Sequence, residues 1–140
     1  MKRRNNLTEN KCIDCGNCCK QTEMILSERD ILCILKDTSL NLNREDFILK
    51  STEGHYQLKN ISGYCFFLKK DTKICRIYEL RPQGCRFYPL IYDLDYRKCI
   101  YDKDCPRTDL FNLSKKELSL TCKKIKKFLK EEIKITFSNI

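Results

Sequence analysis

The chain has 140 residues, which suffices for one compact domain and hardly for two. It contains 11 cysteines and no alanine, valine or tryptophan, so its core must come mainly from Ile, Leu, Phe and Tyr, with the cysteines supplying part of the stability. Lys and Arg number 28 against 19 Asp and Glu, a formal net charge of +9 that is compatible with RNA or an acidic protein as partner.

The sequence predicts no targeting or membrane segment. Basic residues 2–4 are followed by polar residues rather than by the apolar stretch and cleavage site of a signal peptide. The longest apolar runs, Ile31–Leu35 and Tyr64–Leu68, are far shorter than the roughly 20 residues that span a bilayer. We therefore expect a cytoplasmic protein and no membrane contact. In that compartment dense cysteines more often bind metals or do redox chemistry than form disulfides, which remain the alternative.

Two capping patterns predict helices early in the chain. Ser27 and Asp30 form a capping box that opens a helix through Lys36. A second pattern, at residues 43–46, predicts another helix to about residue 50. The residues of the first helix expected to face inward are Ile31, Leu32 and Leu35.

Short aromatic and β-branched runs then predict two hairpins. Tyr64–Leu68 and Lys73–Ile77 flank the polar residues 69–72 and read as the arms of the first. Leu90–Tyr92 and Lys98–Ile100 are expected to pair as the second.

The clearest predicted element is a C-terminal amphipathic helix that begins with the capping box of Ser114 and Glu117. Apolar residues recur at helical steps at Leu118, Cys122, Ile125, Leu129 and Ile133. The opposite face carries Lys115, Lys116, Lys123, Lys124, Lys126, Lys127, Lys130 and Lys134.

These elements predict one small, loop-rich, metal-stabilised α+β domain with short β-hairpins and flanking helices. Residues 1–11 form a basic N-terminal segment, 12–113 a cysteine-cluster metal-binding region, and 114–140 a basic amphipathic helix packed on the same domain.

The densest signal is the run from Cys12 to Cys19, with the spacing C-x-x-C-x-x-C-C. Gaps of two residues allow successive thiolates to converge on one centre, as in zinc sites and iron–sulfur ferredoxins. Gly16 suits the turn between them because it can take a positive φ. Side chains of the adjacent pair Cys18 and Cys19 diverge, so we expect three of the four cysteines to serve one centre and the other to face a second.

Four later cysteines stand in predicted loops or at element ends. Cys65 and Cys75 lie on the arms of the first hairpin, Cys85 follows in an arginine-rich segment, and Cys105 precedes Pro106. At such positions a thiolate can be presented to a metal without breaking a strand ladder.

The order of these features resembles the CxxCxxCC cysteine-cluster family (YkgJ-like), a zinc- or iron-chelating domain. The run at 12–19, Cys65 before Phe66, the C-x-I-Y-E-x-R-P-x-x-C-R-x-Y-P pattern of residues 75–89, and a late Cys105 carry the resemblance over roughly residues 10–107. The metal ligands that the resemblance implies are Cys12, Cys15, Cys18, Cys19, Cys65, Cys75, Cys85 and Cys105.

Eight thiolates fit two zinc sites, two [4Fe–4S] clusters, or one of each, so their number does not choose the metal. The triple spacing of the first run favours iron–sulfur, because structural zinc sites usually pair two separated C-x-x-C units.

The other three cysteines fall outside the pattern. Cys33 and Cys122 lie on apolar stretches and are expected to fill the core as small hydrophobes. Cys99 lies six residues before Cys105 and is either a reserve ligand or a residue buried in the second hairpin.

No catalytic set can be assembled from the sequence. The only histidine, His55, is expected in a surface loop. Phosphate-binding glycine motifs are absent, and the cysteine block's similarity to part of flagellin lysine methylases is not accompanied by a cofactor fingerprint. The arginines beside the motif cysteines are expected to anchor its loop, or alternatively to bond thiolates or an anionic substrate: Arg76, Arg81 and Arg86.

We therefore expect a metal-binding protein, most readily an iron–sulfur protein with an electron-transfer, cluster-handling or accessory role, and an unidentified protein partner. The alternative is a zinc-structured basic module that binds RNA or a ribonucleoprotein through the lysine-rich helix and nearby tyrosines.

Overall fold

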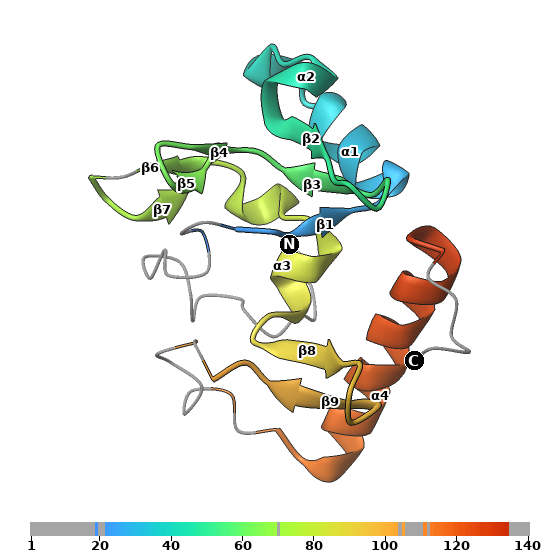
Figure 1. Ribbon diagram of the computed structural model, residues 1–140. Helices are drawn as coiled ribbons and strands as arrows, with labels where there is room; N and C mark the ends of the chain where they lie inside the picture. Colours follow the sequence, from blue (N-terminus) through green and yellow to red (C-terminus); the bar gives the residue numbers. More distant parts are fainter. Residues whose placement is uncertain are drawn as a thin grey trace.

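The computed structural model describes residues 19, 22–69, 71–103, 105, 111 and 113–134. Within them the predicted α+β class is confirmed: helices accompany four small antiparallel sheets. Figure 1 shows the elements in two groups, with α3 (Gln83–Phe87) between them. In the described residues, no helix is long and apolar enough to cross a membrane.

The first group is built on a three-stranded antiparallel sheet of order β1-β3-β2. Its strands are β1 (Ile25–Leu26), β2 (Ile48–Lys50) and β3 (Tyr56–Leu58). Helix α1 (Glu28–Leu35) follows β1 directly (Figure 1). Its predicted capping box is confirmed, with Ser27 accepting from the Asp30 N–H and Asp30 accepting from the Ser27 N–H.

The inward face of α1 differs from the prediction. Ile31 and Ile34 are fully buried, whereas Leu32 is 47% exposed and Cys33 is exposed. The helical period explains the difference, because positions 31 and 34 share one face while 32 and 33 turn away from it. The expectation that Cys33 fills the core is therefore wrong.

The second predicted helix is only one turn long. Helix α2 (Arg44–Phe47) has the predicted capping box, but the chain then enters an extended conformation at Ile48 and continues as β2. Ile48 pairs with Leu58, and Phe47 is fully buried. Pairing with β3 and burial of Phe47 thus outweigh the local helical tendency.

The first predicted hairpin is present but shorter than expected, and a second hairpin that was not predicted precedes it. Strands β4 (Asn60–Ile61) and β5 (Tyr64–Cys65) pair around a two-residue loop, and β6 (Leu68–Lys69) pairs with β7 (Ile74–Cys75) around the predicted polar turn. Both loop residues of the β4–β5 hairpin, Ser62 and Gly63, have positive φ, as the commonest two-residue hairpin turns require.

The second group is a hairpin covered by the C-terminal helix (Figure 1). Strands β8 (Leu90–Asp93) and β9 (Lys98–Tyr101) pair as predicted. Helix α4 (Lys115–Lys127) begins at the predicted Ser114 cap and continues as a π-helical turn over Phe128–Glu132. Its buried face includes Ile125, Phe128 and Ile133.

A disulfide joins α4 to the hairpin, between Cys99 and Cys122. It contradicts both earlier expectations for these residues, since Cys99 is neither a spare metal ligand nor a buried thiol and Cys122 is not a free core residue. Tyr92 and Cys99 are register partners, so they share the hairpin face that meets the helix. On that face the Lys126 ammonium lies 5.7 Å from the centroid of the Tyr92 ring.

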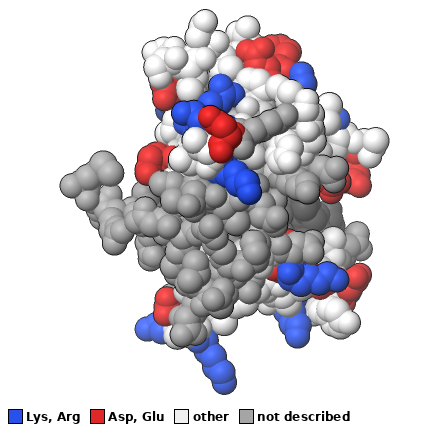
Figure 2. Space-filling view, turned by 90° about the vertical axis from the view of Figure 1, so that its left-hand side faces the viewer, with Lys and Arg blue, Asp and Glu red and all other residues white. Residues whose placement is uncertain are grey.

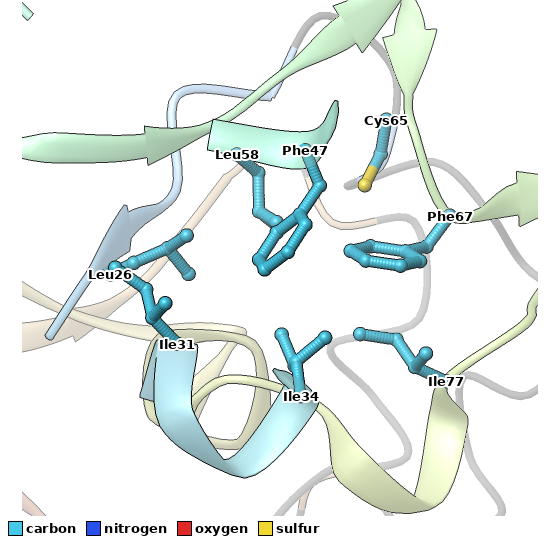
Figure 3. Close-up of a cluster of buried hydrophobic side chains, with 8 residues drawn as sticks. All are labelled: Leu26, Ile31, Ile34, Phe47, Leu58, Cys65, Phe67 and Ile77. Carbon is cyan, nitrogen blue, oxygen red and sulfur yellow. The ribbon is translucent and has the colours of Figure 1, made fainter. Parts of the chain in front are cut away.

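The main core lies in the first group and is drawn in Figure 3. Phe47 and Phe67 are at its centre, with ring centroids 5.4 Å apart. A cysteine, Cys65, is part of this core and is only 5% exposed. The complete cluster is Leu26, Ile31, Ile34, Phe47, Leu58, Cys65, Phe67 and Ile77.

Candidate metal centre

Cys65 is the most deeply placed candidate ligand in the described part of the first group. Its sulfur points from β5 toward the Phe47 and Phe67 rings (Figure 3). The Cys19 thiol donates a hydrogen bond to it and lowers the pKa of Cys65, as do the Phe67 N–H and the Arg76 guanidinium, while burial opposes them. The net effect is a lowered pKa, which favours the thiolate that a metal binds.

The Cys19–Cys65 contact brings Cys19, the last cysteine of the run, to the β4–β5 hairpin. Two hydrogen bonds between Asn60 and Thr22, here called the clamp, hold the chain near Cys19 to the hairpin. The Thr22 N–H donates to Asn60 Oδ1 at 3.1 Å, and Asn60 Nδ2 donates to the Thr22 carbonyl at 2.8 Å. Asn60 is the register partner of Cys65, so one hairpin binds Thr22 and also carries the buried thiol.

Cys75 is presented by the neighbouring hairpin. It pairs with Leu68 across β6 and β7 and is half-buried against the main core. The next residue, Arg76, donates from its guanidinium to the Phe66 carbonyl at 2.8 Å and lies 5.1 Å from the centroid of the Phe66 ring. The arginine thus connects the Cys75 strand to the segment that follows Cys65.

Cys85 lies in the middle of α3, which is anchored to α1 by a buried carboxylate. Asp30 Oδ1 accepts from the Gln83 N–H at 3.0 Å and from Gln83 Nε2 at 3.2 Å. Gln83 Nε2 also donates to Glu132 Oε1 at 2.9 Å, so the C-terminal helix meets α3 at the same point. Gly84 permits a further close approach, because a Cβ there would overlap the Met24 sulfur.

Cys105 is buried and is tied to the end of α3. The Cys105 N–H donates to the Asp102 carbonyl at 3.1 Å, and the Asp102 N–H donates to the Pro89 carbonyl at 2.7 Å. The Tyr88 hydroxyl donates to Asp102 Oδ2 at 2.8 Å. The Tyr-Pro pair that ends the motif therefore positions the segment carrying the last candidate cysteine.

Most of the chain matches the model of a known protein family. The model of the CxxCxxCC family, described as "Putative zinc- or iron-chelating domain", matches residues 11–123. The chain belongs to this family. Membership supports metal binding and leaves the choice between zinc and iron open.

A relative of the chain occurs in Methanocaldococcus jannaschii, as an uncharacterized protein that is 34% identical over 83 residues. The alignment covers 56% of this chain and 43% of the relative, so the chain matches less than half of that protein's length. No solved structure is significantly similar to the chain.

The predicted ligands of this CxxCxxCC chain are gathered only in part. Cys19, Cys75 and Cys85 pack against the core that contains Cys65. Cys105 is connected to the end of α3 through the hydrogen bonds of Asp102. Within the described residues, no three His, Cys, Asp or Glu side chains come close enough together to hold a metal ion. The predicted ligands Cys12, Cys15 and Cys18 lie outside the described residues, so the set of eight stays a prediction.

The residues present fit the metals that the family description names. Thiolates are the usual ligands of structural zinc and of iron–sulfur clusters. Cys19 and Cys65 already lie in contact, and the lowered pKa of Cys65 reduces the free energy needed to deprotonate it. The donor chemistry thus suits either metal.

Among the motif arginines, Arg81 has a clear anchoring contact. It is buried, its Nε donates to the Tyr78 carbonyl at 2.8 Å, and its guanidinium carbon lies 3.8 Å from the centroid of the Tyr78 ring. His55 lies in the turn between β2 and β3, where its carbonyl accepts from the Ser51 N–H. Both observations agree with structural roles.

Sequence reasoning missed the polar residues that bring the cysteine segments together. Asn60 gave no signal, because its partner lies 38 residues away. Asp30 was recognised as a helix cap, but its bonds to Gln83 were not predicted. Tyr88 is part of the pattern at residues 75–89, but the bond from its hydroxyl to Asp102 was not predicted.

Proposed function

We propose that the chain holds an iron–sulfur centre through its cysteine thiolates and works in electron transfer or cluster handling, in support of a larger partner protein. The observation that carries this proposal is the contact of Cys19 with Cys65 at the edge of an aromatic core. It joins Cys19, the last cysteine of the C-x-x-C-x-x-C-C run, to a downstream cysteine, and a centre with ligands from separate segments needs such contacts.

The surroundings of Cys65 support a redox centre over a purely structural ion. Phe47, Phe67 and Ile77 pack around it and are almost completely buried. Apolar side chains exclude water, and the Phe67 N–H reaches the sulfur. Burial and hydrogen bonds to sulfur are two of the means by which proteins set the potential of an iron–sulfur cluster.

The test is metal analysis of the full chain purified without oxygen. We expect iron and acid-labile sulfide in similar amounts, visible charge-transfer absorption, and bleaching of that absorption on reduction. Colourless protein with stoichiometric zinc would refute the iron–sulfur proposal and leave metal binding intact. Protein that binds neither metal would refute metal binding as well.

A second candidate function is a zinc-structured module that binds RNA, and the surface of α4 favours it. Seven lysines in α4 and the residues that follow it are exposed, and the disulfide fastens the helix to β9. Lys126 is half-buried against Tyr92, which leaves the others available to phosphates: Lys115, Lys116, Lys123, Lys124, Lys127, Lys130 and Lys134. On the face drawn in Figure 2, by contrast, the coloured basic and acidic residues are intermixed.

Binding of a single-stranded RNA oligonucleotide tests this second function. Each phosphate contact lowers the slope of log K against log salt by about 0.7. Changing Lys123, Lys124 and Lys127 to Gln should therefore flatten the slope by about 2 units. No binding at low salt, or a slope unchanged by the triple substitution, would exclude this helix as the RNA-binding surface.

A further inference from the structure

We infer that Asn60 is a positioning residue for the metal centre, holding Thr22, and through it Cys19, near the strand that carries Cys65; this inference rests on the proposed metal-binding function. Thr22 lies three residues beyond Cys19, the last cysteine of the run. Asn60 bonds both main-chain groups of Thr22, at 3.1 Å and 2.8 Å. A carboxamide suits this pairing because it offers one acceptor and two donors.

The clamp acts on the geometry of the thiols. Asn60 faces Cys65 across the β4–β5 ladder, so the side chain that binds Thr22 starts from the residue opposite the buried thiol. Thr22 is itself buried, at 8% exposure, and its Oγ1 accepts from the Met24 N–H at 3.1 Å. Thr22 is therefore held at a defined place near Cys65, and the Cys19 thiol contacts the Cys65 sulfur.

The fold does not depend on this clamp in the same way. The β4–β5 hairpin is paired through its main chain, and its turn is set by Ser62 and Gly63. Downstream of Thr22, the Leu58 N–H donates to the Met24 carbonyl and keeps the chain aligned with the sheet. Loss of the Asn60 amide should therefore loosen Thr22 and Cys19 and leave the sheet and hairpin in place.

The test compares Asn60→Asp with Asn41→Asp in the full chain. Aspartate at 60 still accepts from the Thr22 N–H but turns an oxygen toward the Thr22 carbonyl, which replaces a hydrogen bond by repulsion. Asn41 is exposed with φ 51°, a conformation that Asp also tolerates, so it undergoes the same change of charge away from the clamp. Co²⁺ is the probe, because its bonds to thiolates produce charge-transfer absorption that counts the thiolates bound.

We expect Asn60→Asp to weaken Co²⁺ binding about tenfold or more and to lower the thiolate–cobalt absorption, with Asn41→Asp unchanged; losses of this size are typical for residues that orient metal ligands. Metal-free Asn60→Asp should unfold in urea close to the wild type. Wild-type Co²⁺ affinity and absorption in Asn60→Asp would overturn the inference, as would a loss of metal-free stability without a loss of affinity.

Two further arms keep the test decisive. If Asn60→Asp does not fold, Asn60→Gln replaces it, because Gln is also a neutral amide but places the amide group one methylene farther from the main chain. We expect weaker Co²⁺ binding from Asn60→Gln, and unchanged binding would overturn the inference. If the wild type binds neither Co²⁺, zinc nor iron, the proposed function itself fails and the inference with it.

Discussion

The buried carboxylate of Asp30 joins α1 to α3 by hydrogen bonds, and its removal should lower the free energy of unfolding strongly. It accepts from the Ser27 N–H at 3.0 Å and from two donors of Gln83, at 3.0 and 3.2 Å. Replacing Asp30 with Ala leaves two main-chain N–H groups without this acceptor at a site that is 5% exposed. Each buried, unsatisfied donor costs about 1–3 kcal/mol, so we expect a loss of about 3–4 kcal/mol.

Such a loss is a large part of the roughly 5–15 kcal/mol that stabilises a domain. The assay is urea unfolding of the metal-free protein, followed by circular dichroism. With a slope of about 1.5–2 kcal/mol per molar urea, the midpoint of Asp30→Ala should fall by about 2 M. Removing metal beforehand separates the junction's contribution from that of the thiolates.

The chain contains a matched control for this substitution. Asp46 occupies the equivalent capping position of α2, where it accepts from the Asn43 N–H at 2.8 Å, but the bond is exposed and no bond to a distant segment accompanies it among the described contacts. Asp46→Ala should cost about 0.5–1 kcal/mol, the value of a cap alone. Equal losses from Asp30→Ala and Asp46→Ala would refute the reasoning, because the bond to Gln83 would then contribute nothing.

Three further substitutions test other parts of the fold. Cys99→Ser removes a disulfide of sequence separation 23, which should cost about 3 kcal/mol in unfolding experiments. In the denatured wild type, thiol titration after reduction should find all 11 cysteines, at least two more than before it. Gly84→Ala should lower the free energy of unfolding by about 1 kcal/mol, because displacing the Met24 sulfur outweighs the helical preference of Ala; a stabilised variant would contradict this. Glu28→Gln tests the bond to Arg44, which lowers the pKa of Glu28. Because the pKa of Glu28 is lowered in the folded state, the ion pair stabilises the fold above the usual Glu pKa, and this stabilisation is lost as pH falls through the folded-state pKa. At pH 7 the exposed pair should contribute less than about 1 kcal/mol. A stability difference between Glu28→Gln and the wild type that persists in strong acid would contradict this.

The elements that the sequence predicted well are those set by neighbouring residues. The Ser27 and Ser114 capping boxes are confirmed because cap and partner are three residues apart. The β8–β9 hairpin is likewise confirmed, since its strands adjoin a short loop. Prediction failed where a distant partner decided: α2 ends after one turn because Ile48 pairs with Leu58.

For the cysteines, too, the sequence predicted what depends on local spacing and missed what depends on distant partners. The spacing of the first run indicated metal binding, which family membership supports. The disulfide was not foreseen, because Cys99 and Cys122 lie 23 residues apart and pairing cannot be derived from spacing alone. Nor did the sequence reveal that Cys65, rather than Cys33, would lie in the core, since that depends on which side of α1 meets the sheet.

The packing also predicts how the domain responds to metal removal. Small zinc domains unfold without their metal because they lack a sufficient core. Here Phe47, Phe67 and the residues around them form an aromatic and aliphatic core, and Asp30 joins α1 to α3 through hydrogen bonds that need no metal. We therefore expect chelator-treated protein to keep its far-ultraviolet circular dichroism and a cooperative urea transition at a lower midpoint, since a ligand bound only to the folded state adds stability by mass action.

The alternative outcome is equally clear. If chelation abolishes the cooperative transition, the thiolate–metal bonds, rather than the Phe47–Phe67 core, hold the domain together. The Asp30→Ala comparison would then have to be made on the metal-loaded protein. Cysteine labelling gives a local measure: on metal removal Cys19 should become reactive well before Cys65, because Cys65 is 5% exposed within the core and Cys19 is half-buried at its edge. Simultaneous labelling of both would show that core and cysteine run open as one unit.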